Sequence, residues 1–244
     1  MSQNVAPLNR ALSKLGVLSR AQATVAIRAG RVRVGGRVVR DPLAPVVPGR
    51  ARIEIDGHVA ARQAWRTIVF HKPRGVVTTR RDPQGRPTIY DVLGSAGQGL
   101  VAVGRLDLAT SGLMVLTTDT GLADWSADPA HEVPRVSVVT VRGKVEEAEI
   151  DRLTRGIGEG RDRLRAAAIT VRKSSSRESH LTVELREGKN REVRRLFAAI
   201  GHEVTRLKRV RLGGLDLGAI KAGEWRALSI KDIIEAFPHV PVRI

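Results

Sequence analysis

Short apolar segments separated by glycine-containing turns recur from residue 67 to residue 217, and they constrain the fold more than any other feature. Apolar runs of about four to eight residues between turn residues are typical of buried strands, whereas helices need longer stretches with a 3.6-residue period. Many strands with only intermittent helices favour an α+β fold around a mixed, largely antiparallel sheet. The expected strands cover residues 67–70, 100–103, 112–117, 136–143, 166–172, 180–185 and 204–217, the last interrupted by Gly213-Gly214.

Four helices are expected between these strands, over residues 88–93, 120–127, 146–154 and 191–200. Asp119 and Asn190 precede the second and the fourth of them. In that position a short polar side chain can accept the unpaired backbone N–H groups of a helix N-terminus. Residues 71–75, His-Lys-Pro-Arg-Gly, are typical of a turn.

The first part of the chain reads as a separate small module. A stripe of leucines predicts a helix that ends at Gly16, and Ser19 with Gln22 has the capping-box spacing that begins a second helix, which runs to about Gly30. Alternating valines around Gly35-Gly36 predict a hairpin. We therefore expect a helix–helix–hairpin module over residues 1–60, with a last strand at 52–56 and a linker at 57–63, and a larger domain over residues 64–244.

Positive charge dominates the composition. Lys and Arg number 42 against 25 Asp and Glu, which gives a formal net charge of +17. Such an excess repels itself unless a polyanion neutralises it, so nucleic acid is the expected partner; the alternative is a merely solubilising surface. A membrane partner is not expected, because neither a long apolar run nor a basic amphipathic anchor is present.

The arginines of the first module occupy positions outside its apolar stripe, and acidic residues are scarce around them. A solvated charged face is the alternative interpretation. The planar guanidinium of arginine, however, suits phosphate contacts and stacks on unpaired bases. We therefore expect an RNA-binding face formed by Arg10, Arg20, Arg28, Arg31, Arg33 and Arg37.

Several kinds of site are excluded by motifs that the sequence lacks. It has no GxxxxGK[ST] loop, no strand-linked GxGxxG and no GxSxG. It has no cysteine, and its six histidines show no metal-ligand spacing. We expect neither a cofactor nor a metal. The first ten residues lack the apolar segment of a secretory signal, which favours a cytoplasmic protein.

One carboxylate lies in an unusual place. Asp107 belongs to a loop, Gly104–Gly112, between two apolar strands, where an aspartate most often forms a turn or caps a backbone group. In the predicted helix 191–200, Arg194 lies at the edge of the apolar stripe and Arg191 nearly opposite it. A partly solvated arginine can pair with a carboxylate and keep it ionised, or it can extend its charged end into solvent.

The first module resembles the S-four RNA-binding module over residues 6–56, in the stretch LNRALSKLGVLSRAQATVAIRAGRVRVGGRVVRDP. Blocks of the larger domain resemble the signature blocks of bacterial ribosomal-RNA pseudouridine synthases of the small-subunit and large-subunit branch: HKPRGVVTT, GRLDLATSGLMVLTTD and EGKNREVRRLFAAIGHEVTRLKRVRLG. Together they span nearly the whole chain. The resemblance implies a mixed sheet with an active cleft across its middle, and isomerisation of a uridine to pseudouridine without a cofactor or metal.

The resemblance also implies roles for individual residues. Asp107 would be the nucleophile and Arg194 its partner, while the uridine leaves its stack in an unpaired loop of ribosomal RNA to reach them. We expect a target in large-subunit (23S) RNA, free or in an assembly intermediate, and a monomeric enzyme. The residues implied to line the RNA path are Lys72, Arg105, Lys189 and Arg191.

Ser137 departs from the family pattern. There a tyrosine in a Lys-x-Tyr sequence packs on the flipped base, whereas this chain has Arg135-Val136-Ser137. A serine hydroxyl can contact the base but lacks the ring, whose stacking is worth about 1–3 kcal/mol. The alternative to an enzyme is a non-catalytic ribosomal-RNA-binding or ribosome-assembly factor on the same fold. A chaperone that binds RNA through charge alone leaves the Asp107 block unexplained.

Overall fold

Two compact units make up the part of the chain that the computed structural model describes, residues 5–47, 50–61, 64–159 and 162–241. The first unit extends to Arg66 and includes two short later segments, Gly99–Val101 and Thr118–Thr120; the second unit holds the remaining residues. Within the described ranges, no helix has the length and apolar character needed to cross a membrane.

The first unit contains the predicted helix pair and hairpin. At the start of α2 (Arg20–Arg28), Ser19 Oγ accepts from the Gln22 backbone N–H at 3.2 Å, and the Gln22 side chain accepts from the Ser19 N–H at 3.0 Å, so the capping box is confirmed. The hairpin strands are β2 (Val32–Val34) and β3 (Arg37–Val38). The other elements are β1 (Ala6–Pro7), α1 (Leu8–Lys14), β4 (Pro45–Val46), β5 (Ile53–Ile55) and β6 (His58–Val59).

Strand β6 corrects the predicted linker at residues 57–63. Ile55 pairs with His58 across a two-residue turn, Asp56-Gly57, in which both residues have left-handed φ angles of 51° and 82°. An Asp-Gly pair favours this type of hairpin turn, and the resulting sheet has the order β3-β2-β5-β6. Residues 62 and 63 of the predicted linker lie outside the described residues.

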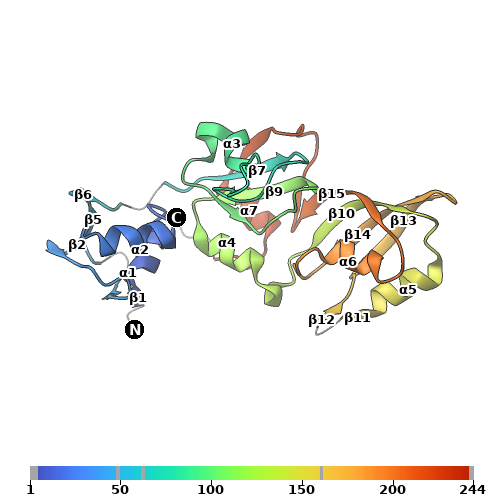
Figure 1. The fold of residues 1–244 in the computed structure, drawn as a ribbon, viewed down its shortest axis with the longest axis horizontal. Helices are drawn as coiled ribbons and strands as arrows, with labels where there is room; N and C mark the ends of the chain where they lie inside the picture. The colour runs from blue at the N-terminus through green and yellow to red at the C-terminus, as the bar shows by residue number, and fades with distance from the viewer. Residues whose placement is uncertain (1–4, 48–49, 62–63, 160–161, 242–244) are drawn as a thin grey trace. The chain divides into compact units, whose positions relative to one another are not determined.

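A nine-stranded sheet forms the centre of the second unit (Figure 1). Its strands are β7 (Thr67–Lys72), β8 (Val101–Val103), β9 (Ser111–Thr117), β10 (Arg135–Arg142), β13 (Ala168–Ser174), β14 (Glu178–Leu185), β15 (Val204–Leu212), β16 (Leu215–Asp216) and β17 (Trp225–Leu228). The main order is β13-β14-β10-β15-β9-β7-β17. The β9–β15 pair is parallel and its neighbours are antiparallel, so the predicted mixed, largely antiparallel sheet is confirmed.

The four predicted helices are present as α3 (Ile89–Leu93), α4 (Thr120–Ala127), α5 (Glu147–Arg155) and α6 (Glu192–Ala198). The cap predicted for α6 is wrong. Arg191, not Asn190, immediately precedes the helix, with a left-handed φ of 50° and no side-chain capping bond. The strands and the α-helix of the second unit that the sequence patterns did not reveal are β11 (Ile157–Glu159), β12 (Asp162–Leu164), β17 and α7 (Ile230–Ala236).

Helices α5 and α6 pack on one face of β10, β14 and β15. This core includes Val139, Val141, Leu153, Leu181, Val183, Leu196 and Phe197, all completely buried.

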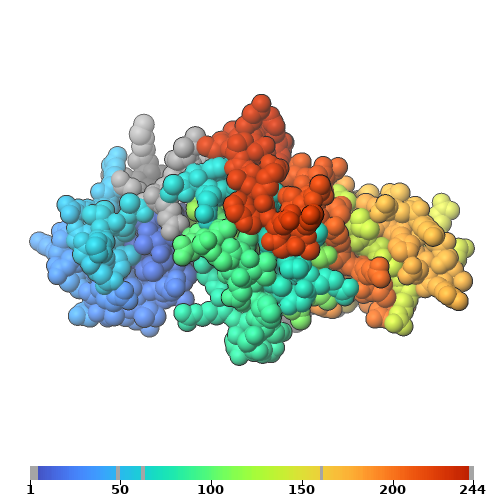
Figure 2. Space-filling model, turned by 90° about the horizontal axis from the view of Figure 1, so that it is seen from above, coloured from blue at the N-terminus to red at the C-terminus, as the bar shows by residue number. Residues whose placement is uncertain are grey.

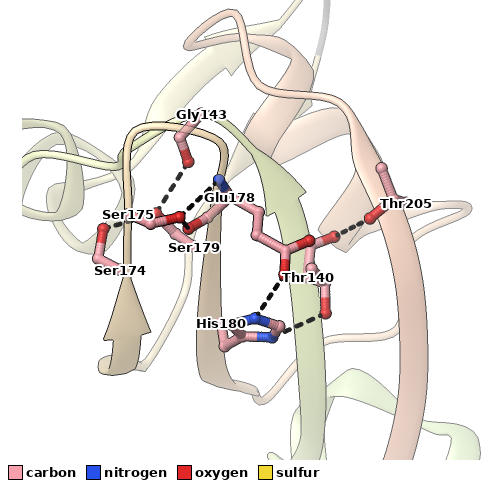
Figure 3. A network of polar contacts seen from close by, with 8 residues as sticks. All are labelled: Thr140, Gly143, Ser174, Ser175, Glu178, Ser179, His180 and Thr205. Carbon is pink, nitrogen blue, oxygen red and sulfur yellow. Dashed lines mark hydrogen bonds and ion pairs between the residues drawn. The ribbon is translucent and has the colours of Figure 1, made fainter.

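A network of polar contacts joins β10 and β14 (Figure 3). Thr140 Oγ1 lies 3.2 Å from His180 Nδ1, and His180 Nε2 lies 2.9 Å from Glu178. The buried Ser179 hydroxyl donates to the Gly143 carbonyl oxygen at 2.9 Å and so ties β14 to the turn after β10.

The C-terminal segment completes the edge of the sheet at β7. β17 pairs with β7, and the His71 N–H donates to the Glu224 carbonyl oxygen at 3.0 Å. In the space-filling view these late residues (red) lie against the segment around β7 and α3 (teal and green) (Figure 2). Residues far apart in the sequence therefore hold β7, the strand that ends at Lys72.

The parallel β9–β15 pair depends on one glycine. Gly112 lies opposite Arg209 with φ +115°, and a Cβ atom on Gly112 would lie 2.1 Å from the Arg209 carbonyl oxygen. Real Cβ atoms do not approach a backbone oxygen so closely. Glycine at this position therefore allows the two strands to meet.

Candidate active site

A cavity of about 190 Å³ opens beside the loop between β8 and β9. Its walls come from this loop, the end of α4, the start of β10, the loop between β14 and α6, and β15. Its size suits one small ring rather than a drug-sized molecule, for which pockets of roughly 300–1,000 Å³ are usual. Its polar lining includes Arg105, Asp107, Thr110, Ser126, Arg135, Ser137, Lys189, Arg191, Glu192 and Arg209.

Asp107 lines this cavity with 28% of its side chain exposed. Its Oδ2 lies 3.6 Å from Nη1 of Arg191, which forms an ion pair with it. The backbone around it is fixed, because the Asp107 carbonyl oxygen accepts from the Thr110 N–H at 3.0 Å and from Lys72 Nζ at 3.1 Å. The Asp107 carboxylate therefore lies on a loop fixed by hydrogen bonds and remains accessible to a ligand.

Lys72 is completely buried, which corrects its predicted place on the RNA path. Its Nζ donates to the carbonyl oxygens of Pro73 (3.0 Å), Asp107 (3.1 Å) and Thr110 (2.8 Å). Burial lowers the pKa of Lys72 to about 8, and the charge of Asp107 opposes that shift. The side chain holds the Asp107 loop and has no surface with which to touch a phosphate.

Arg191, and not Arg194, forms the ion pair with Asp107, which corrects the predicted partner. Arg191 precedes α6 in a left-handed conformation, so helical periodicity does not set the direction of its side chain. Arg194 Nη1 donates to the Val204 carbonyl oxygen at 2.8 Å, and its Nη2 lies 3.5 Å from the Ala109 carbonyl oxygen. Burial, helped by the charge of Arg191, lowers the pKa of Arg194, whereas the charge of Asp107 raises it. Arg194 thus adds positive potential near Asp107 without direct pairing.

Three further predicted contact residues line the same cavity: Arg105, Ser137 and Lys189. Arg105 is exposed, and Ser137 is buried. Lys189 is half-buried, and its Nζ is held 2.5 Å from Glu187. The described residues contain no group of three or more His, Asp or Glu side chains that could hold a metal ion.

The arginines of the predicted face in the first unit are exposed, as RNA binding requires, but two of them, Arg31 and Arg33, are held by hydrogen bonds. Arg31 donates from Nε to Asp56 at 2.9 Å and from Nη2 to the second carboxylate oxygen. Arg33 Nη1 donates to the Gly36 carbonyl oxygen at 3.1 Å. The remaining exposed arginines of the predicted face are Arg10, Arg20, Arg28 and Arg37.

Arg209 is a candidate that the sequence interpretation missed. It lies opposite Ser137 in the β10–β15 register, lines the cavity and is 6% exposed. Its Nε donates to the Leu113 carbonyl oxygen at 2.7 Å. Burial lowers the pKa of Arg209 to about 9, and the charge of Arg135 adds to that shift. A usable signal was present, because Arg209 alternates with the buried Leu207 and so belongs to the inward face of its strand.

Comparison with known proteins identifies the family. The family model described as RNA pseudouridylate synthase matches residues 66–199, and that of the S4 domain matches residues 7–50. The first match covers more than half of the chain. The chain belongs to the RNA pseudouridylate synthase family, a family of isomerases, and carries an S4 domain.

Curated relatives match over nearly the entire chain. An uncharacterized RNA pseudouridine synthase of Aquifex aeolicus is 34% identical, over 97% of this chain and 95% of its own length. The ribosomal large subunit pseudouridine synthase B of Escherichia coli K12 is 37% identical, over 97% of this chain and 86% of its own length. A crystal structure of a pseudouridylate synthase matches with a TM-score of 0.66 at 27% identity, covering 95% of this chain and 99% of that one. The predicted family and fold class are confirmed.

Proposed function

We propose that this protein converts a specific uridine of large-subunit (23S) ribosomal RNA into pseudouridine, with Asp107 as the nucleophile. The observation that carries the proposal is the position of Asp107. It lies on a loop fixed by hydrogen bonds, at a cavity sized for one small ring, and its Oδ2 lies 3.6 Å from Arg191 Nη1. The relatives named for the ribosomal large subunit support this substrate. The protein acts in the bacterial cytoplasm as a monomer and uses no cofactor.

The side chains around Asp107 fit this chemistry. A carboxylate can add covalently to the sugar or the base and then leave again. The Arg191 guanidinium orients the carboxylate, and the half-buried Arg194 adds positive potential. The target uridine must leave its stack at a cost of a few kcal/mol, so it belongs to an unpaired loop, in free RNA or in an assembly intermediate.

The function is tested by expressing the chain in cells that lack their own large-subunit synthases and mapping pseudouridine across both ribosomal RNAs. We expect one new pseudouridine in large-subunit RNA. Modification of small-subunit RNA alone would change the proposed substrate. The absence of any new pseudouridine, despite co-purification with ribosomal RNA, would establish the non-catalytic alternative.

Ser137 is the observation that favours that second candidate, a ribosomal-RNA-binding or assembly factor. The serine is buried in the cavity wall and leaves the cavity without the ring expected in the family. Ser137→Tyr is expected to raise the single-turnover rate of pseudouridine formation about tenfold, because base–aromatic stacking is worth about 1–3 kcal/mol. Ser137→Ala serves as the control and should stay close to wild type. A slower Ser137→Tyr variant would show that the cavity has adapted to the serine.

Lys72→Met is expected to lower turnover about 10–100-fold, because displacement of a reacting group by even 1 Å has effects of this size. The affinity for RNA should stay within about twofold of wild type, since Lys72 is completely buried. The control is Arg105→Met, which removes an exposed cation from the cavity and should weaken binding. Equal losses of RNA affinity in the two variants would indicate that Lys72 contacts the RNA.

The S4 domain is proposed to bind RNA through its exposed arginines. The triple variant Arg10→Gln, Arg20→Gln and Arg28→Gln should weaken RNA binding and lower the slope of log K against log salt by about 2–3, because each phosphate contact contributes about 0.7–0.9. Binding assays over a range of salt concentrations measure this slope. The matched triple lysine variant keeps the charge and should retain it. An unchanged slope in the glutamine variant would place the phosphate contacts elsewhere.

A further inference from the structure

Arg209 has an incomplete set of hydrogen bonds at the centre of the sheet. Ser137 faces it from β10 and Gly112 faces it from β9. Its Nε donates to the Leu113 carbonyl oxygen, but its buried Nη2 has no acceptor among the residues that the structure describes. Arg209 is 6% exposed and its Nη2 is buried, so bulk water does not satisfy the two N–H donors of Nη2.

Other polar atoms around the cavity are also without partners. Thr110 Oγ1, Ser126 Oγ and Glu192 Oε1 are buried, belong to residues that line it, and have no hydrogen-bond partner among the described residues. A buried polar atom left unpaired costs about 1–3 kcal/mol, so this concentration indicates a place for a polar ligand. Arg135 differs, because its guanidinium already donates to three backbone carbonyl oxygens.

We propose that Arg209 binds a carbonyl oxygen of the flipped uracil and stabilises the negative charge that forms there. This role rests on the function proposed above. Asp107, Ser137 and Arg209 line the same cavity, so a nucleotide whose ribose meets Asp107 can bring its base to Ser137 and Arg209. A buried guanidinium with unused donors requires an acceptor, and uracil offers two carbonyl oxygens.

A hydrogen bond from Arg209 to a carbonyl oxygen of uracil would accelerate the reaction. When the bond between uracil N1 and ribose C1′ breaks, its electron pair stays on the base, and the charge spreads from N1 onto both carbonyl oxygens. Asp107 bonds to C1′ as the N1 bond breaks, and carbon 5 then displaces the carboxylate from C1′. The hydrogen on carbon 5 leaves as a proton and N1 takes up a proton, so the composition is unchanged. A preorganised donor at a carbonyl oxygen favours the state with the charge over the neutral ground state.

The first test compares variants on an unmodified large-subunit RNA transcript. Arg209→Met should lower the single-turnover rate about 10²–10³-fold, the usual effect of removing one donor to a developing anion, with the RNA dissociation constant within about twofold. Arg209→Lys should recover part of the rate. Arg211→Met is the matched control, because it removes an exposed arginine from the same strand and should stay near wild type. A rate for Arg209→Met within threefold of wild type would overturn the proposal, as would equal losses of rate and affinity.

The second test does not require catalysis. The ¹⁵N side-chain signal of Arg209, assigned by its absence from Arg209→Met, is followed while uridine 5′-monophosphate or ribose 5-phosphate is added to the wild-type chain. A shift with the nucleotide alone supports a contact to the base. A shift with both compounds identifies a phosphate site, and no shift shows no contact; either result overturns the proposal. If the wild-type chain modifies no RNA, the proposed function fails, and this measurement still decides whether Arg209 binds the base.

Discussion

Asp107→Asn is expected to reduce pseudouridine formation at least about 10³-fold, which corresponds to about 4 kcal/mol of lost transition-state stabilisation. The amide has nearly the size of the carboxylate but carries no charge and is a poor nucleophile. The Asp107 carbonyl oxygen, which accepts from Lys72 and Thr110, is unaltered, so the loop should keep its position. Single-turnover assays on the RNA and pseudouridine mapping in cells measure the loss.

Affinity for RNA distinguishes a catalytic role from a structural one. Asp107→Asn should bind RNA within about twofold of wild type, since base unstacking and phosphate contacts do not depend on the nucleophile. Asp128→Asn provides a control in the same unit, because Asp128 caps a short 3-10 helix at residues 129–131 and lies on the surface. More than a tenth of wild-type activity in Asp107→Asn would rule out the nucleophile role.

Gly112→Ala is expected to destabilise the second unit by about 3–5 kcal/mol, combining backbone strain with overpacking. The new Cβ would meet the Arg209 carbonyl oxygen at 2.1 Å and the Arg209 nitrogen at 2.5 Å, so β9 and β15 would have to separate. In a protein of about this size each kcal/mol lowers the melting temperature by roughly 2–4 °C, which gives a fall of about 10 °C.

Calorimetry of a second glycine variant separates strain from steric clash. Gly218 also has a positive φ, +55°, but nothing lies within 4 Å of a Cβ built there. Gly218→Ala should therefore cost only the conformational penalty, about 1–2 kcal/mol. Equal losses in the two variants would mean that the close approach of β9 and β15 does not set the stability of the unit.

Local patterns in the sequence predicted the parts of the fold that local interactions determine. The Ser19/Gln22 capping box and the valine hairpin of the first unit appear as expected. Strand β17 escaped because Trp225–Leu228 has three exposed residues and is defined by pairing with the distant β7. Helix α7 was also overlooked, although Ser229 and Asp232 have capping-box spacing and make both hydrogen bonds.

The candidate site was predicted only in part, for physical reasons. The Asp107 loop could be located because two apolar strands frame it. The direction of Arg191 could not be predicted, because its backbone leaves the helical conformation that the periodicity assumed. The burial of Lys72 depends on three carbonyl oxygens that converge on it, one of them in the next residue and two in a loop more than thirty residues away.

The left-handed backbone of Arg191 places a conformational cost at the residue that forms an ion pair with Asp107. A side chain other than glycine in the left-handed region costs roughly 1–2 kcal/mol, which asparagine or glycine would largely avoid. Either replacement would also remove the cation that faces Asp107. Selection for heat resistance alone would favour such replacements, whereas selection for the ion pair with Asp107 would retain the arginine despite its conformational cost. The residue found at this position among descendants of the chain should therefore indicate whether each lineage was selected mainly for heat resistance or for the ion pair with Asp107.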